Sequence, residues 1–439
     1  MEDNTTYMFD NVTIAIPDIT MFEFITEGVV LTLLGLMGII GNVISLIILS
    51  KPEMRSSVNC GLQGLAFFDT IVLISSVTML GLHKLGYKMA ILYRYTFEIF
   101  PFVVMVAYPV GLIAQTGSVW TTVGVTVERY VAVCHPLKAR FICTYRRARI
   151  FNLLIVIFAV CYNIPRFWEI NVTEVLDPST NSSVYIAKPS DFRMNKLYYK
   201  VYYIWLYLFV MYFIPFLALA VLNIFIWRAV QNANKDRQQL TRREEKEIGL
   251  AMMLICVVSI FFVCNILALL INILELFDLF VPALVRVSNL LVTFNSSINF
   301  VIYCIFGQKF KKMFLHMFLR VSPDKEPELH QHPADDSHRD SEERRLSPRE
   351  NQISHPQWNT PVKQFVDSFF FFFFCTIRYV LYSPCHLKGT VIWKSSKGNY
   401  LGFGRAKFHG VCYLNSRYIR QDFRIFKPTS SHSIGSSDV

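Results

Sequence analysis

Charged side chains are scarce in this 439-residue sequence, since Asp, Glu, Lys and Arg make up only 17% of it and hydrophobic residues make up 53%. With a mean hydropathy of +0.38, the chain is too apolar for an ordinary soluble enzyme of this length. A hydrocarbon core about 30 Å thick requires about 20 mostly apolar residues per helix. The segments that meet this requirement are 27–50, 59–82, 101–133, 149–167, 200–227, 248–274 and 282–305. The sequence therefore predicts an all-α membrane fold, a bundle of seven transmembrane helices.

Basic residues are absent from the amino-terminal segment, where no Lys or Arg precedes Lys51, whereas the loop 134–149 carries several and no acid. Lys and Arg close to span ends stay cytoplasmic, so we expect the amino terminus outside the cell. Four Asn-x-Ser/Thr glycosylation sites fall on the expected outer side: Asn4, Asn11, Asn171 and Asn181. A cleavable signal pattern is also lacking, and we expect the first span to act as an uncleaved anchor. These features predict a multi-pass protein of the plasma membrane.

Cysteine is absent from every expected extracellular segment, so these segments offer no disulfide. The spans also lack a His/Glu metal set and a nucleophile with its base, which argues against an enzyme. The seventh span has no lysine for a retinal Schiff base, and the two halves show no inverted repeat or broken helices typical of transporters. A transporter remains the weaker alternative, and nothing indicates a nucleic-acid partner.

Polar residues inside the spans form a small set. Asp69 is the only acid of the second span, and a carboxylate in hydrocarbon must be paired, protonated or bound to an ion. In the seventh span, Asn295 and Asn299 are one helical turn apart, and Ser296 is adjacent to Asn299 on the helix surface. This clustering predicts a pocket for one ion or water.

An acid and a base, Glu128 and Arg129, stand at the end of the uncharged run 101–127. An ionisable residue at membrane depth costs about 2.5–3.5 kcal/mol on insertion scales, so the pair is a functional hypothesis by default. The alternative is an interfacial ion pair that only anchors the third span.

Several strings resemble those of rhodopsin-like G-protein-coupled receptors: GNVIS, LAFFD, ERYVAVCHPLKAR, IPF, and NFVIY followed by FGQKFKK. They occur over about 1–320, in the order and on the spans that this family has. The longer strings QTGSVWTTVGVTVERYVAVCHPLKAR and YNIPRFWE resemble invertebrate FMRFamide-type neuropeptide receptors. This resemblance implies an extracellular peptide ending in an Arg-Phe amide as ligand and a heterotrimeric G protein as partner; another amidated peptide, or an orphan receptor, is the alternative.

The resemblance also implies roles for particular residues. Arg129 is expected to pair with Glu128 in the inactive state and to swing inward when the sixth span moves out, completing a G-protein switch with Tyr130 and Tyr303. Oxygen ligands and a negative charge suit a hard cation, and the residues that match the family's allosteric sodium pocket are Asp69, Ser118, Asn295, Ser296 and Asn299. Helix association through buried hydrogen bonds is the alternative reading of this set. No cofactor is expected apart from this ion.

The chemistry of an amidated peptide suggests where it would bind. A cationic arginine requires a carboxylate, and a carboxamide requires a side chain that both donates and accepts hydrogen bonds. Candidates near the expected extracellular mouth are Gln115, Trp168, Glu169, Asn272, Glu275 and Asn289. An aromatic residue near a span end is also a common membrane-interface anchor, which is the alternative for Trp168.

The sequence departs from the family pattern at defined places. The usual cysteines of the third span and of the following extracellular loop are absent, so we expect that loop to be less tethered. Asn265 and Leu267 stand in the places of the usual tryptophan and proline of the sixth span, which predicts a straighter helix.

Composition divides the chain into an extracellular glycosylated segment (1–26), the seven-helix domain (27–305), a short amphipathic eighth helix (306–320) and a disordered cytoplasmic tail (321–439). Ser322, Ser341 and Ser347 are candidates for phosphorylation that recruits arrestin, the alternative being a solvated spacer. Six consecutive Phe from Phe369 begin a basic, aromatic end. We interpret 365–439 as an artefact of gene annotation or an alternative exon, or else as a segment that binds the inner leaflet.

Overall fold

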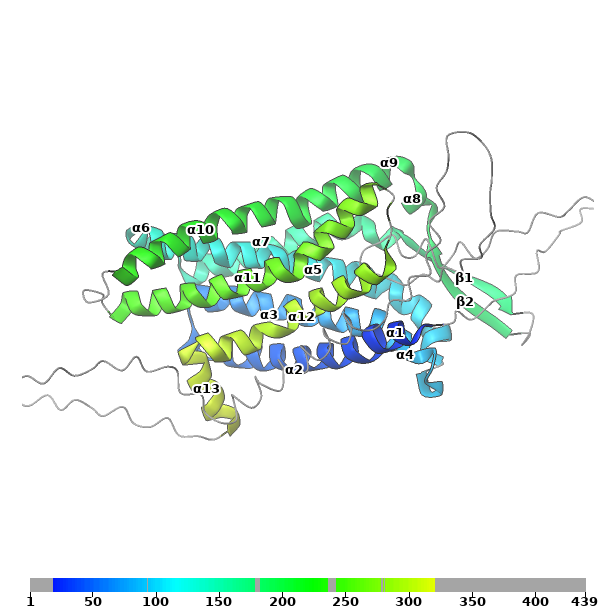
Figure 1. Cartoon of the computed structure of the whole chain (residues 1–439), viewed down its shortest axis with the longest axis horizontal. Coiled ribbons are helices and arrows are strands. Elements are labelled where there is room, and N and C mark those ends of the chain that lie inside the picture. Colours follow the sequence, from blue (N-terminus) through cyan, green and yellow to red (C-terminus); the bar gives the residue numbers. More distant parts are fainter. Residues whose placement is uncertain are drawn as a thin grey trace, which may run out of the picture.

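The computed structural model describes residues 19–92, 94–177, 182–235, 242–277, 279 and 281–319. Within them, seven helical segments are long and apolar enough to cross a membrane: Met21–Leu49, Ser57–Gly86, Tyr95–Cys134, Tyr145–Trp168, Lys196–Ala233, Ile248–Leu276 and Pro282–Phe306. They lie side by side as one bundle, with the β-strands at one end and α13 at the other (Figure 1). The predicted seven-helix fold is confirmed.

Each span is built from one main helix, in several cases extended by π-helical or 3-10 turns at the end opposite α13. The main helices are α2 (Leu31–Leu49), α3 (Ser57–Ser76), α5 (Phe100–Cys134), α7 (Tyr145–Asn163), α10 (Ile214–Lys235), α11 (Arg242–Leu276) and α12 (Pro282–Phe306). The extensions are α1 (Met21–Glu23) with η1 (Phe24–Val30), η3 (Val77–Leu82) with α4 (His83–Gly86), η5 (Tyr95–Ile99), η6 (Ile164–Trp168), and α9 (Lys196–Tyr198) with η7 (Tyr199–Leu206) and η8 (Phe209–Phe213). The remaining turns are η2 (Pro52–Met54), η4 (Ala90–Leu92), α6 (Pro136–Ile142) and α8 (Asp191–Met194).

Local sequence explains where these helices begin and end. Ser56 caps α3, because its hydroxyl oxygen accepts a hydrogen bond from the backbone N–H of Asn59 at 3.1 Å. Pro282 occupies the first turn of α12, where its missing N–H costs nothing. The helix α11 runs unbroken through Asn265 and Leu267, as expected for a span without a proline.

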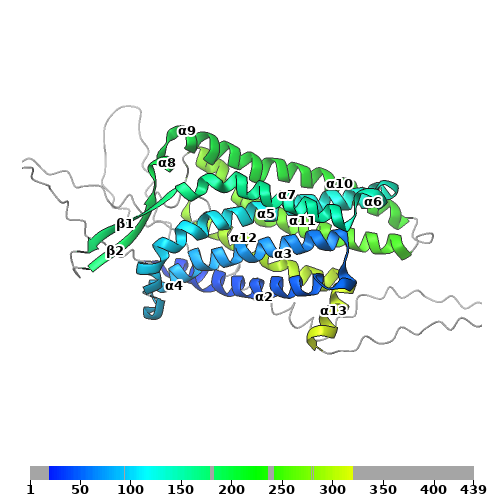
Figure 2. The ribbon, with the colours of Figure 1, turned by 180° about the vertical axis from the view of Figure 1, so that it is seen from behind.

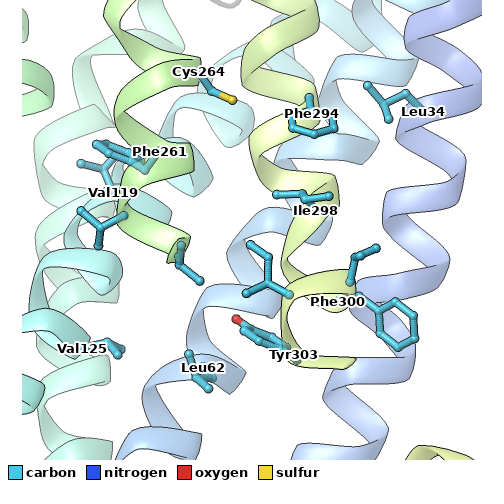
Figure 3. Close-up of a cluster of buried hydrophobic side chains, with 14 of the residues drawn as sticks. Leu34, Leu62, Val119, Val125, Phe261, Cys264, Phe294, Ile298, Phe300 and Tyr303 are labelled. Atoms are coloured by element: carbon cyan, nitrogen blue, oxygen red, sulfur yellow. The ribbon is translucent and has the colours of Figure 1, made fainter. Parts of the chain in front are cut away.

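The bundle core lies between α2, α3, α5, α11 and α12. Figure 3 shows part of it, where Leu62 of α3 and Val119 of α5 lie across from Phe261 of α11 and Tyr303 of α12. The apolar window of the seventh span is 72% buried and that of the fourth only 22%, so α12 is central and α7 faces lipid. Helices α3 and α5 can approach closely because Gly61 has no side chain; a Cβ atom at this position would overlap Val125.

One element departs from the all-α expectation. The loop after η6 forms an antiparallel hairpin of β1 (Ile170–Asp177) and β2 (Ser182–Pro189), with Ile170 opposite Pro189 and Asp177 opposite Ser182. The hairpin projects from the end of the bundle opposite α13 (Figure 2). Its Val, Ile and Thr residues favour a strand, whereas only a loop is expected here from the sequence. The predicted glycosylation site Asn171 is exposed on β1, whereas Asn4, Asn11 and Asn181 lie outside the described residues.

The predicted eighth helix is confirmed as α13 (Gln308–Leu319), which leaves the bundle after Gly307. Phe310 and Leu315 are buried against the core, whereas Lys309 and Lys312 are exposed, as an amphipathic interfacial helix requires. Lys309 donates a hydrogen bond to the carbonyl of Glu53. The predictions for the tail, 321–439, lie outside the described residues.

Candidate functional site: three polar centres along the bundle

The first centre lies at the end of the bundle that carries α13 (Figure 1), and we name it the cytoplasmic centre after the orientation expected from the distribution of Lys and Arg. It contains the predicted switch pair. Arg129 of α5 is only 3% exposed, and its Nη2 lies 3.5 Å from Oε1 of Glu128. The same carboxylate oxygen accepts a hydrogen bond from the hydroxyl of Ser57, the first residue of α3. Glu128 therefore joins the second and third spans while it neutralises the buried guanidinium.

The other predicted switch residues pack nearby against different elements. The ring of Tyr130 contacts His135 and Phe225, with centroids 5.4 Å and 5.9 Å away. It belongs to a cluster that joins Val230 of α10 to Ala251 of α11. Tyr303 is 1% exposed and packs on Phe310 of α13 at 5.6 Å. The cytoplasmic ends of α5, α10 and α11 are thus in contact, and Arg129 is covered.

The central centre surrounds Asp69, which is fully buried. Its Oδ1 accepts hydrogen bonds from the hydroxyls of Ser118 at 2.7 Å and Ser296 at 3.0 Å, and its Oδ2 accepts one from Nδ2 of Asn299 at 2.7 Å. The structure therefore brings together four of the five residues predicted for an ion pocket, from α3, α5 and α12. Among the hydrogen bonds of the described residues, none joins the fifth, Asn295, to Asp69.

Two buried oxygens close to this centre lack a hydrogen-bond partner among the described residues. Asn42 of α2 donates to the carbonyl of Ser296 at 2.9 Å, but its buried Oδ1 has no hydrogen-bond partner among the described residues. The buried hydroxyl of Tyr303 also has no hydrogen-bond partner among the described residues. Buried acceptors of this kind are satisfied in proteins by water or ions. One carboxylate with hydroxyl and amide oxygens suits sodium, so the residues present fit that ion.

The third centre lies at the opposite end of the bundle, and we name it the extracellular centre after the same expected orientation. It is organised by Glu169, which follows η6 and is fully buried. Its Oε1 accepts hydrogen bonds from Arg166 at 3.0 Å and from the hydroxyl of Tyr198 at 2.6 Å, and its Oε2 accepts one from the hydroxyl of Tyr108 at 2.9 Å. Nη1 of Arg193 lies 3.9 Å from the same oxygen. Glu169 thus joins the base of the hairpin to the third, fourth and fifth spans. The expectation of a loosely tethered loop does not hold at its base.

Aromatic rings enclose the two arginines of this centre. The guanidinium of Arg166 lies over the rings of Tyr202, Tyr203 and Tyr207 at 4.9, 4.9 and 5.5 Å. Arg193 donates to the hydroxyl of Tyr203 at 2.8 Å. Cation–π contacts of desolvated arginine are worth about 2 kcal/mol or more. In this network, two arginines balance the charge of Glu169, and both of its carboxylate oxygens accept hydrogen bonds.

A second buried charge cluster lies between the first and seventh spans. Arg286 of α12 donates to Glu23, and its Nε lies 4.0 Å from Oε2 of Glu27. The predicted ligand residue Asn289 donates to Oε1 of Glu27 at 3.3 Å. Both acids are at most 4% exposed. Asn289 therefore belongs to a contact that holds α1 and η1 against α12.

The other residues predicted to bind ligand have different surroundings. Oε1 of Gln115 is buried and has no hydrogen-bond partner among the described residues. Asn272 donates to the hydroxyl of Tyr212 at 3.3 Å, and Glu275, near the outer end of α11, is 8% exposed. Trp168 is 61% exposed. Gln115 thus keeps an unsatisfied acceptor, and Trp168 lies on the surface.

Sequence reasoning missed several residues of these centres. Arg166, Tyr108 and Arg193 complete the Glu169 network, and Glu27 and Arg286 form the second cluster. A usable signal existed for the second cluster, because an ionisable residue within an apolar helix requires a partner. No comparable signal identifies Tyr108, since a tyrosine in an apolar span resembles any other core residue.

Comparison with known proteins agrees with this arrangement. Residues 41–303 match the family described as 7 transmembrane receptor (rhodopsin family). The chain is 46% identical over 311 residues to the FMRFamide receptor of Drosophila melanogaster, covering 70% of this chain and 57% of that protein. It is 35% identical over 290 residues to the FMRFamide peptide receptor frpr-18 of Caenorhabditis elegans (63% and 65%), and 28% identical over 330 residues to the Drosophila sex peptide receptor (66% and 72%). The matched part spans less than two thirds of the first two relatives.

Seven apolar helices, a buried acid at mid-bundle and an acid–arginine pair at one end define a membrane receptor of the seven-helix class. The chain belongs to the rhodopsin family of seven-transmembrane receptors. This is a family of signalling receptors and not of enzymes.

Proposed function

We propose that this protein is a plasma-membrane neuropeptide receptor, which binds extracellular peptides ending in Arg-Phe amide and activates a heterotrimeric G protein. The observation that carries the signalling part is the buried Glu128–Arg129 pair at the cytoplasmic end of α5. The peptide class is supported by similarity to relatives named as FMRFamide receptors.

The buried state of Arg129 supports a two-state mechanism. Its charge is neutralised by Glu128, and the cluster of Tyr130, Val230 and Ala251 closes the space between α5, α10 and α11. A G protein would bind the other arrangement, in which this cluster opens and Arg129 is uncovered. A peptide that binds the open arrangement more tightly shifts the population towards it by its differential affinity.

For the ligand, the structure favours some of the predicted residues over others. The carboxylate of Glu169 already has four internal partners, and Asn289 is bound to Glu27, so neither offers a vacant group. Gln115 has a buried acceptor that the NH₂ group of a peptide carboxamide would satisfy. We assign the peptide amide to Gln115, and from the chemistry of their side chains we propose Asn272, Glu275 and Trp168 as further contacts of the peptide.

We also propose that the Asp69 centre binds an allosteric sodium ion through Asp69, Ser118, Ser296 and Asn299. The unpaired Oδ1 of Asn42 supports a ligand at this depth. The ion would supply positive charge to a buried carboxylate and so favour the arrangement in which the second, third and seventh spans converge.

Two further proposals concern the surfaces of the molecule. Asn171 is exposed on β1, which supports its glycosylation. We propose that Asn4, Asn11 and Asn181 are also glycosylated and that the amino terminus is extracellular. Arrestin is proposed as a second cytoplasmic partner, recruited by phosphorylation of the tail. Peptide N-glycosidase digestion of Asn171→Gln and wild-type protein tests the first proposal by a mobility difference.

The experiment that tests the function measures intracellular calcium and cAMP in cells expressing the full chain. The challenge is a panel of amidated peptides, each paired with its free-acid form and with a form in which Ala replaces the penultimate arginine. We expect a dose-dependent response to Arg-Phe amides that both changes weaken and that Arg129→Ala abolishes at equal surface expression. A response to a different amidated peptide would overturn the ligand assignment and keep the switch. A response that survives Arg129→Ala would overturn the switch.

A further inference from the structure

A cavity of about 200 Å³ lies between α3, α5 and α7, beside the cytoplasmic centre. Its walls are mostly apolar and include Val125, Val131, Ala148 and Phe151. An apolar cavity of about 150 Å³ already takes up a benzene-sized guest. The space is therefore large enough for part of a hydrocarbon chain.

The cavity is shaped and placed like a slot in the inner leaflet. Along α5 it extends from Thr121 to Val131, which at about 1.5 Å per residue corresponds to about 15 Å. This is half of a hydrocarbon core about 30 Å thick. Its lining residues Val127, Ile142 and Phe151 are 42%, 48% and 48% exposed on the bundle surface. The slot consequently opens towards lipid and not only towards the cytoplasm.

Positive charge surrounds the cytoplasmic mouth of the slot. Arg147 lines it, and Nη1 of this exposed residue donates to the carbonyl of Phe141 at 2.7 Å, which fixes the guanidinium at the mouth. Arg146 and Arg149 lie on the same helix, on either side of Arg147 in the sequence, and the segment 134–149 contains no acid. Anionic lipids of the inner leaflet are attracted to such clusters by about 1 kcal/mol per basic residue.

The one acid of the slot does not oppose an anionic guest. The carboxylate of Glu128 lines the same space but is paired with Arg129 and accepts a hydrogen bond from the hydroxyl of Ser57. The negative charge is therefore compensated from within the bundle, while the charge of Arg147 faces outwards.

We propose that this slot binds an anionic phospholipid of the inner leaflet, with one acyl chain along Val125 and Phe151 and the phosphate held by Arg147. A lipid seated there contacts the three helices that meet at Glu128. It would stabilise the arrangement in which Ser57 and Arg129 both contact that acid, so the bilayer acts on the switch from outside the bundle.

Two cysteines of the chain provide a direct readout. Cys143 lines the slot, whereas Cys134, at the end of α5, lies with its Sγ 3.9 Å from the carbonyl of Phe225 and outside the slot. Purified full-length protein is placed in nanodiscs of phosphatidylcholine alone or with added phosphatidylserine. The rate of N-ethylmaleimide labelling at each cysteine is measured by peptide mass spectrometry. Cys134 corrects for the general effect of an anionic surface on thiol reactivity.

We expect phosphatidylserine to slow labelling of Cys143 at least fivefold more than labelling of Cys134. Arg147→Gln should remove this difference, while the matched neighbour variant Arg146→Gln should retain it. Ala148→Leu, which fills the slot and keeps the charge, should also remove it. Thermal unfolding of each variant verifies that the bundle is intact.

Three results would overturn the proposal. Equal slowing at both cysteines would mean that the slot is not the lipid site. Equal loss in Arg146→Gln and Arg147→Gln would reduce the effect to surface charge. Protection of Cys143 by soluble glycerophosphoserine in phosphatidylcholine discs would show a phosphate-ester site without a lipid. No peptide or G protein enters this experiment, so its failure is separate from failure of the proposed receptor function.

Discussion

Replacing Glu169 with Gln should release the hairpin from the bundle. The substitution keeps the size of the side chain and removes its charge, so Arg166 and Arg193, at 1% and 3% exposure, lose their common counter-charge. Removing one partner of a buried ion pair costs about 3–5 kcal/mol. Tyr108→Phe removes the hydrogen bond to the same carboxylate and the longer one from Arg166, keeps the charge of Glu169, and should cost about 1–3 kcal/mol. The order of these two effects is fixed by the geometry.

Amide hydrogen exchange of the backbone in 170–177 and 182–189 measures this release without a ligand. A loss of about 3–5 kcal/mol corresponds to a roughly hundredfold to several-thousandfold faster exchange, since each 1.4 kcal/mol is a factor of ten. Glu174→Gln is the matched control, because Glu174 lies on β1 with an exposed side chain and should change stability by less than about 0.5 kcal/mol. If Glu169→Gln exchanged no faster than Glu174→Gln, the network would not hold the hairpin and the reasoning would be refuted.

Three further changes test the other centres. Asp69→Asn should abolish any difference in agonist affinity between sodium and choline buffers; a difference that persists would exclude Asp69 as the sodium ligand. Arg286→Gln removes the guanidinium that lies between the buried acids Glu23 and Glu27 and should lower the free energy of unfolding by about 3–5 kcal/mol. Arg94→Gln, in the exposed Arg94–Glu98 pair, should lower it by at most about 1 kcal/mol in the same assay. Ser57→Ala removes a hydrogen bond to Glu128 worth about 1 kcal/mol and should raise peptide-independent signalling about fivefold; unchanged basal signalling would place this bond in both arrangements.

The fold was predictable because long apolar runs and the distribution of Lys and Arg are strong signals. The hairpin was not, because eight strand residues between polar turns resemble a loop when no sheet partner is known. The Asp69 centre was predictable because a single acid in an apolar span needs polar partners.

The same argument applied to Glu27 and Arg286 would have paired the first and seventh spans, but it requires knowing which helices are neighbours. Pairing in sequence is ambiguous here, since each charge has several candidate partners at similar depth. Glu169 is a ligand candidate from the sequence, since its partners Tyr108 and Tyr198 lie in other spans and sequence spacing does not reveal them. Only the packing of α5 against η6 and α9 shows that Tyr108 and Tyr198 reach it.

One helix takes part in all three centres. Tyr108 of α5 binds Glu169, Ser118 binds Asp69, and Arg129 pairs with Glu128. From Tyr108 to Arg129 the helix rises about 31 Å at about 1.5 Å per residue. A continuous helix is stiff along its axis, so a peptide that displaces the outer end of α5 must also act on the Asp69 hydrogen bonds and on the cover of Arg129. The hairpin is held on Tyr108 through Glu169, so Glu169→Gln is a test of signal transmission as well as of stability.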